Sequence, residues 1–86
     1  MTDNAIADEI KRLLRARAPT ATICPSEVAR ALAPENAAAW RALMPQVRRV
    51  AAAMAATGLL RVTQRGMPVD ANLAKGPIRL GRGLEG

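Results

Sequence analysis

The residues of this chain best suited to chemistry are cations in its second half. From Asn36 to Gly86 the sequence holds eight Lys and Arg residues against Asp70 and Glu85, which accounts for the whole net charge of +6 at pH 7. From Met1 to Glu35, by contrast, five bases balance five acids. An excess of this sign and size favours a polyanion as partner. Two groups of side chains can serve such a partner, one on an expected helix and one on an expected β-hairpin.

The first group is Gln46, Arg48 and Arg49, near the start of an expected helix. An arginine can donate two hydrogen bonds to O6 and N7 of guanine, and a glutamine can bind adenine in the same bidentate way. Helical spacing places Val47 and Val50 on the opposite, buried side, so both arginines should be largely exposed. The hypothesis is a helix that contacts DNA bases. The plainer alternative is an arginine pair that only solvates the helix.

The second group is Arg61, Arg65, Lys75 and Arg79, on or beside two expected strands. Arg61 alternates with apolar neighbours and Arg79 does the same, so both should lie on the outer face of the hairpin. Like charges on one face repel unless an anion or an acidic side chain lies between them. The pattern therefore predicts a strip that contacts DNA phosphates. In the alternative, Asp or Glu side chains of the first helix neutralise it.

The composition argues against an enzyme. There is no histidine and a single cysteine, so the Ser-His and Cys-His nucleophile pairs lack their base and a zinc site lacks ligands. We therefore expect no catalytic residue, no metal and no cofactor. An enzyme stays conceivable only if Glu27, Arg30 and Arg41 converge in a pocket.

Cys24 and Trp40 have structural interpretations that compete with functional ones. Cys24 falls at the expected N-cap of a helix, where the helix dipole can make a thiol reactive, so a redox sensor is the alternative to a small, partly buried residue. Trp40 is the only aromatic residue. We expect it to fill a gap against the first helix rather than to stack on a base, because proteins that bind single strands usually offer several rings.

The elements that position these residues follow from apolar spacing and from prolines. A helix is expected from Asn4 to about Arg17, capped by Asp3 or Asn4, and a short strand over residues 20–24. Pro25 then suits the first position of a second helix, which Pro34 stops.

Pro45 predicts a break in the next helical stretch. A proline inside a helix costs roughly 3 kcal/mol, so we expect a short helical segment over residues 35–43 and a main helix from Pro45 to Gly58, with Gly58 as the C-terminal cap. Two strands should follow, around residues 60–63 and 78–80, and pair as an antiparallel hairpin. The connection over residues 65–76 is long, with a helical turn expected from Asp70 to Leu73.

This order of elements is that of a winged helix-turn-helix domain, an α+β and mainly α fold with three main helices and a β-hairpin wing. Four stretches, residues 23–30, 40–48, 62–66 and 76–80, resemble a small bacterial family known as domain of unknown function 3253. The resemblance implies a winged-helix fold and brings no activity, substrate or catalytic residue. One departure matters: the segment Pro34 to Met44 lies where winged-helix domains usually have a tight turn.

We therefore expect a single winged-helix domain over residues 1–86, with the wing at about 59–81 and a flexible tail at 82–86. The expected function is binding of double-stranded DNA, as a regulator or accessory factor. The alternative is a protein-interaction adaptor that uses an apolar patch beside Trp40, formed by Ala38, Ala39, Leu43 and Met44. The sequence leaves open whether the chain forms a homodimer; the first helix is the expected surface for one, unless the core uses this helix fully. No segment resembles a membrane span or a secretory signal, which favours the cytoplasm.

Overall fold

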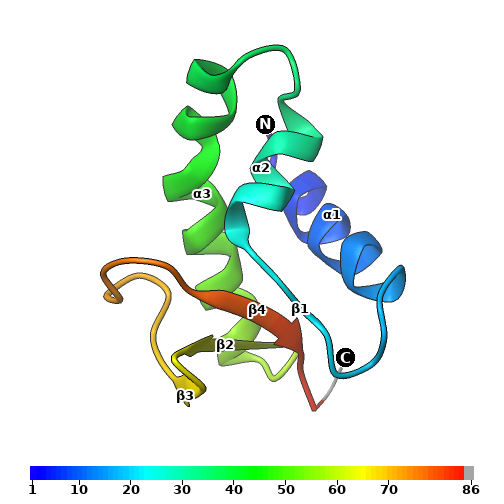
Figure 1. Cartoon of the computed structure of the whole chain (residues 1–86), viewed down its shortest axis with the longest axis vertical. Coiled ribbons are helices and arrows are strands. Elements are labelled where there is room, and N and C mark those ends of the chain that lie inside the picture. The colour runs from blue at the N-terminus through cyan, green and yellow to red at the C-terminus, as the bar shows by residue number, and fades with distance from the viewer. Residues whose placement is uncertain (85–86) are drawn as a thin grey trace.

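The computed structural model describes residues 1–84, which form three helices and a four-stranded antiparallel sheet and are mainly helical (Figure 1). In chain order the elements are α1 (Asp3–Arg15), β1 (Thr22–Ile23), α2 (Pro25–Leu32), α3 (Ala37–Ala56), β2 (Leu60–Gln64), β3 (Met67–Pro68) and β4 (Arg79–Arg82). Across residues 1–84, no helix combines the length and the apolarity that crossing a membrane requires. The predicted α+β class, dominated by helix, is confirmed.

The sheet order is β1-β4-β2-β3, so the last strand lies between the first and the second. Strands β2 and β4 pair directly and antiparallel, as the alternating pattern predicted. Leu80 of β4 lies opposite Val62 on one side and Ile23 on the other, and all three are buried. Side chains alternate between the two faces of a strand, so this register gives the sheet one apolar inner face and one polar outer face.

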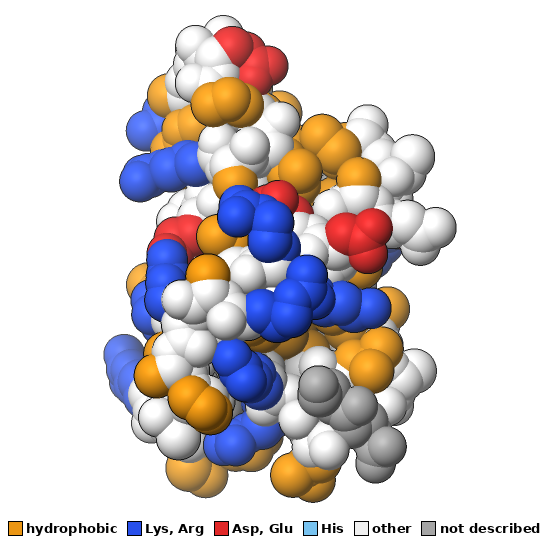
Figure 2. All heavy atoms as spheres, turned by 90° about the vertical axis from the view of Figure 1, so that its right-hand side faces the viewer, with side chains coloured by type: hydrophobic (Ala, Val, Ile, Leu, Met, Phe, Trp, Pro, Cys, Tyr) orange, Lys and Arg blue, Asp and Glu red, His pale blue; other side chains and the backbone are white. Residues whose placement is uncertain are grey.

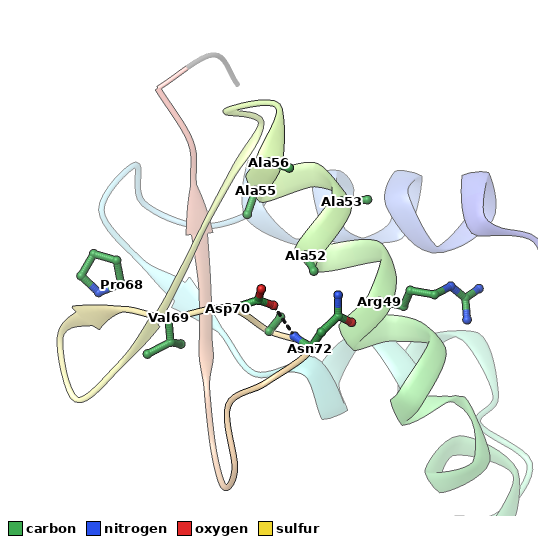
Figure 3. A pocket seen from close by; sticks show the side chains of 10 residues that line it. Arg49, Ala52, Ala53, Ala55, Ala56, Pro68, Val69, Asp70 and Asn72 are labelled. Carbon is green, nitrogen blue, oxygen red and sulfur yellow. Dashed lines mark hydrogen bonds between the residues drawn. The ribbon is translucent and has the colours of Figure 1, made fainter.

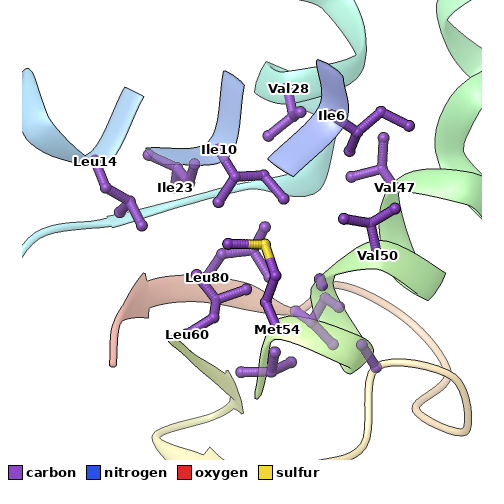
Figure 4. Close-up of a cluster of buried hydrophobic side chains, with 14 of the residues drawn as sticks. Ile6, Ile10, Leu14, Ile23, Val28, Val47, Val50, Met54, Leu60 and Leu80 are labelled. Carbon is purple, nitrogen blue, oxygen red and sulfur yellow. The ribbon is translucent and has the colours of Figure 1, made fainter. Parts of the chain in front are cut away.

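The inner face of the sheet closes one core with all three helices (Figure 4). The buried apolar residues are Ile6, Ile10 and Leu14 of α1, Val28 and Ala29 of α2, Val47, Val50, Ala51 and Met54 of α3, and Ile23, Leu60, Val62, Ala71, Ile78 and Leu80 from the sheet and its connections. No polar or charged residue among residues 1–84 is buried. Since the apolar stripe of α1 is used in this core, it does not offer a free apolar face to a second copy.

Helices α1 and α2 begin at residues that satisfy their free backbone N–H groups. Thr2 caps α1, its Oγ1 accepting a hydrogen bond of 3.1 Å from Ala5 N, so the predicted cap at Asp3 or Asn4 is wrong by one residue or two. Threonine is also a favoured N-cap residue, although Asp and Asn are preferred to it. Pro25 opens α2 directly after the N-cap Cys24, as predicted.

Helix α3 runs unbroken through Pro45, so the predicted split into two helical segments is wrong. Asn36 caps its start, with Oδ1 accepting from Ala39 N at 2.8 Å. Pro45 is exposed, and both halves of the helix around it are held by packing: Trp40 and Leu43 before it, Val47 and later residues after it. Burial of that apolar stripe outweighs the roughly 3 kcal/mol that an interior proline costs.

Gly58 confirms the predicted end of α3. It lies just past the C-cap Thr57 with φ of 80°, and its N–H donates to Ala55 O while that of Leu59 donates to Met54 O. This is the Schellman pattern, which turns the chain directly into β2.

The connection after β2 is more ordered than predicted. Arg65 and Gly66 both have positive φ and form a two-residue hairpin turn that starts the short strand β3. Asp70 then accepts a hydrogen bond of 2.7 Å from Asn72 N in a single turn. Strand β4 extends to Arg82, beyond the predicted end at residue 80. Of the flexible tail expected at 82–86, Arg82 belongs to β4, and residues 85 and 86 lie outside the described part of the chain.

Candidate functional site

The outer face of the sheet brings together cations from strands that are distant in the sequence. Arg61 lies opposite Gly81, and Arg79 lies opposite Thr63, so both arginines project from the same, solvent-facing side. This is the arrangement predicted from the alternation in each strand. Gly81 has no side chain, so nothing on β4 covers Arg61 from directly across the ladder.

Arg79 is fixed by its neighbour strand. Its Nε donates to Thr22 Oγ1 and its Nη2 donates to Thr22 O, both at 2.9 Å. These two bonds hold the guanidinium plane against β1. In residues 1–84, no ion pair joins an acid of α1 to Arg61 or Arg79: Glu9 binds Arg12, and Asp3 binds Arg49. The described residues therefore do not show the neutralisation by the first helix that was the alternative.

Two hollows open on this side of the molecule, and no acidic side chain lines either of them. One, of about 580 Å³, is lined by Gln64, Arg65, Lys75, Gly76, Pro77 and Arg79. The other, of about 330 Å³, lies against Arg61, Thr63 and Arg82 and the chain between α1 and β1. Both contain guanidinium groups, beside the ammonium of Lys75 in the larger hollow and beside threonine hydroxyls in the smaller one, which is a suitable chemistry for an oxyanion such as a phosphate.

Arg65 has a backbone conformation that is unfavourable for residues other than glycine. Its φ is 54°, and it is the only residue other than glycine with positive φ in the part of the chain described. Turns of this kind normally take Asn, Asp or Gly at this position, because a side chain in the left-handed region is strained. The side chain is exposed at the tip of the β2–β3 hairpin. Strain of this kind is common where a side chain has a function.

The three residues of α3 predicted to contact bases are bound within the protein. Gln46 Nε2 donates to Met1 O at 2.8 Å and to Asp3 Oδ1 at 2.9 Å. Arg49 Nη2 donates to the same Asp3 oxygen at 2.9 Å. These contacts lower the pKa of Asp3, with the hydrogen bond from Gln46 as the largest favourable cause. Both residues thus connect α3 to the start of α1. They also lie in the middle of the helix and not at its beginning.

Arg48 holds the long connection that precedes β4. Its Nη1 donates to Ala74 O at 3.0 Å and its Nη2 to Gly76 O at 2.7 Å. The predicted exposure is therefore wrong for Arg48, which is half-buried, whereas Arg49 is exposed. The reason is that this connection folds back onto α3, which the spacing of apolar residues within the helix could not reveal.

The exposed face of α3 beside this connection is apolar. A hollow of about 700 Å³ lies between the last two turns of α3 and the chain from β3 onward. Figure 3 shows the side chains that line it. Its lining on the helix is Ala52, Ala53, Ala55 and Ala56, with Arg49, Asp70 and Asn72 at its edge. One cation beside one acid gives this surface little net charge.

A second cationic region lies at the end of α1 and was missed in the sequence. The acids of α1 precede its cations. Lys11, Arg12 and Arg15 are exposed in its last turns, followed by Arg17, and of these four Arg12 pairs with Glu9 and Arg17 with Glu27. Arg82 of β4 donates to Leu14 O and Arg17 O at 2.9 and 3.0 Å, which brings the end of α1 next to the sheet. Figure 2 shows Lys and Arg side chains across the middle of this side of the molecule. Summing charge over the first 35 residues concealed this separation.

One family model, described as Protein of unknown function (DUF3253), matches residues 3–83. The chain belongs to this family. No curated protein matches the sequence. The DUF3253 description names no activity, so any function has to be argued from the surfaces of the molecule.

In this DUF3253 chain, Glu27 stabilises the start of α2. Its Oε2 accepts a hydrogen bond of 2.7 Å from Cys24 N, and its Oε1 pairs with Arg17 at 2.8 Å. The bond from Cys24 N is the main cause of a lowered Glu27 pKa, with Arg17 adding to it. Cys24 is half-buried, and its Sγ accepts from Ser26 Oγ at 3.1 Å.

Trp40 contacts two arginines from different helices. The guanidinium carbon of Arg30 in α2 lies 4.5 Å from the centre of the ring, and that of Arg41 lies 5.2 Å away. Glu27 is bound instead to Arg17 and to the α2 backbone. These contacts thus bind Glu27 to Arg17, and place Arg30 and Arg41 against Trp40. Within the expected apolar patch, Ala38 is exposed, and Ala39, Leu43 and Met44 are half-buried.

Proposed function

We propose that this protein is a winged-helix domain that binds double-stranded DNA through the basic outer face of its sheet. The order of elements, helix, strand, two helices and two paired strands, supports the winged-helix assignment, as does the position of β4 between β1 and β2. The wing in this proposal is formed by β2, β3 and β4 with the connection between them.

The observation that carries the proposal is the register of β2 and β4. It places Arg61 and Arg79 on one exposed face, with Arg65 and Lys75 beside them and no acid in the adjoining hollows. The phosphate backbone of DNA supplies the matching negative charge, and binding releases its condensed counterions. The cations at the end of α1 extend the positive side of the molecule and can steer DNA toward it.

The proposal assigns a smaller part to Gln46, Arg48 and Arg49 than the sequence suggested. Contact with base edges requires these residues to exchange bonds that they make to the protein itself. Arg49 can do so most easily, because its ion pair with Asp3 is exposed. We therefore propose binding that depends mainly on phosphates and varies little with DNA sequence.

The test is binding of labelled random duplex DNA at several salt concentrations. With about four phosphate contacts, log K should fall with log salt at a slope near −4, following the counterion-release relation. The double variant Arg61→Glu/Lys75→Glu should weaken binding by at least about tenfold for all sequences alike.

The matched control is Arg30→Glu/Arg41→Glu, which changes the net charge equally on a different part of the surface. An equal loss in both variants would show that net charge alone drives binding. Absence of binding at low salt would contradict the proposal.

A second candidate function is that of a protein-interaction adaptor. The alanine-lined hollow beside α3 favours it, because a surface with little net charge and small side chains allows close packing of a partner. Leu73, which is 78% exposed, lies in the adjoining connection. Association with a protein that does not weaken with salt would support this function.

A further inference from the structure

We propose a second binding site, formed by Arg30, Trp40 and Arg41, that takes an acidic and partly apolar peptide segment of a partner protein. This site lies where α2 ends and α3 begins, at the opposite end of the molecule from the sheet (Figure 1). It is therefore independent of the proposed DNA surface and does not rest on it.

The geometry holds two guanidinium groups beside one ring. Arg30 comes from α2 and Arg41 from α3, at 4.5 and 5.2 Å from the ring centre. Each cation is attracted by the negative face of the indole, but two cations near one ring also repel each other. An arrangement of this kind is stabilised further when an anion binds both groups, because guanidinium edges not turned to the ring can donate paired hydrogen bonds to a carboxylate.

No acid of the described chain fills that role. Neither arginine takes part in an ion pair or a side-chain hydrogen bond within residues 1–84, although both are exposed. Glu35, on the connection between the two helices, is exposed and pairs with neither. Glu27 of α2 is bound to Arg17 and to Cys24 N. In our proposal, carboxylates of another molecule bind the two arginines.

The surroundings of the site favour a peptide over a nucleic acid. Trp40 is half-buried against the core and engaged by guanidinium groups, so its ring is not an open platform on which a base could stack. One helical turn earlier in α3, on the side of Trp40 and Arg41, lie the small apolar residues Ala37 and Ala38, both exposed. Carboxylates matched to the two arginines, with apolar side chains against Trp40 and the alanines, describe an acidic amphipathic segment.

Trp40 itself provides the measurement, because the chain has one Trp and no Tyr or Phe. Its fluorescence in the full-length protein should be titrated with an amphipathic peptide of Glu and Leu, and with a peptide of the same pattern in which every Glu is Lys. We expect a saturable change in emission with the Glu peptide only. The variant Arg30→Glu/Arg41→Glu should raise the dissociation constant at least about tenfold, which is about 1.4 kcal/mol.

Controls separate this site from the DNA surface. Arg61→Glu/Lys75→Glu should bind the Glu peptide as the unchanged protein does, and circular dichroism should confirm that each variant is folded. Arg30→Lys/Arg41→Lys keeps the charge but removes the planar fork, so it should bind with intermediate affinity. An equal response to the Lys peptide, or an unchanged dissociation constant in Arg30→Glu/Arg41→Glu, would overturn the proposal. A response to duplex DNA that depends on Arg30 and Arg41 would also overturn it.

Discussion

Arg48 in α3 donates a hydrogen bond of 2.7 Å to the carbonyl oxygen of Gly76, 28 residues further along the chain. A second hydrogen bond, from Arg48 to Ala74 O, ties the same guanidinium group to the same connection. Gln64 reinforces this region from the sheet, since its Nε2 donates to Lys75 O and Pro77 O. Two side chains from different elements therefore satisfy the carbonyl groups of a connection that has no regular structure of its own.

Replacing Arg48 with Ala should destabilise this connection. Hydrogen bonds from a charged donor contribute about 1.5–3 kcal/mol, so the free energy of unfolding should fall by an amount in this range. Urea denaturation measures the loss, and hydrogen exchange should show faster exchange confined to residues 69–78. Arg41→Ala removes an exposed arginine without such bonds and serves as the control. If both variants lose the same stability, Arg48 does not hold the connection.

Replacing Arg65 with Asn should separate stability from binding. Asn tolerates positive φ in a two-residue hairpin turn, so the variant should gain about 1 kcal/mol of stability. It also loses a cation at the proposed phosphate surface, so its affinity for duplex DNA should fall at low salt. Thermal unfolding and DNA titration of the same sample test both effects. A gain in stability with unchanged DNA affinity would remove Arg65 from the proposed surface.

Replacing Pro45 with Ala should stabilise the protein. Alanine restores a backbone donor toward the carbonyl of Arg41 and relieves the clash of the proline ring inside α3. The gain is partly offset by greater freedom of the unfolded chain, which leaves about 1–2 kcal/mol. Urea denaturation at pH 7 would show it as a higher midpoint. A lower midpoint would mean that Pro45 itself is needed for α3 to pack along its whole length.

Replacing Glu27 with Gln should make the free energy of unfolding depend less on pH in the acidic range. The pKa of Glu27 is lowered from its ordinary value of 4.5, so its contribution is complete above that pH and is lost as the pH falls through the lower, folded value. At pH 7 the variant should be less stable by up to about 1 kcal/mol, because Gln keeps an oxygen that can accept from Cys24 N but loses the charge that pairs with Arg17. The two unfolding curves should converge as the pH falls below the lowered pKa of Glu27 in the folded protein. Parallel curves across this range would contradict the assignment.

Local sequence patterns were sufficient to predict those elements whose structure depends on residues close together in the chain. The spacing of Val47, Val50 and Met54 predicted the buried face of α3, and Pro25 predicted the start of α2. Gly58 predicted the end of α3, because a glycine readily adopts the positive φ that follows a helix C-terminus. The alternation around Arg61 and Arg79 predicted their common face. In each case the signal depends on backbone geometry over a few residues.

Features set by distant contacts could not be predicted in this way. Pro45 indicated a break, but packing on both sides of it keeps α3 continuous. Arg48 looked exposed because the connection that it binds lies 26 to 28 residues away. The pairing of Gln46 and Arg49 with Asp3 crosses a still longer span, of 43 and 46 residues. These contacts form only when the chain is folded, and no periodicity within one element records them.

The continuity of α3 has a mechanical consequence. Its 20 residues extend about 30 Å and connect the Arg30, Trp40 and Arg41 site at one end to the start of β2 at the other. A rigid spacer of this kind keeps the two surfaces apart, so a partner at one end does not sterically block a partner at the other. Two ligands held on such a spacer would be brought to a set distance and angle.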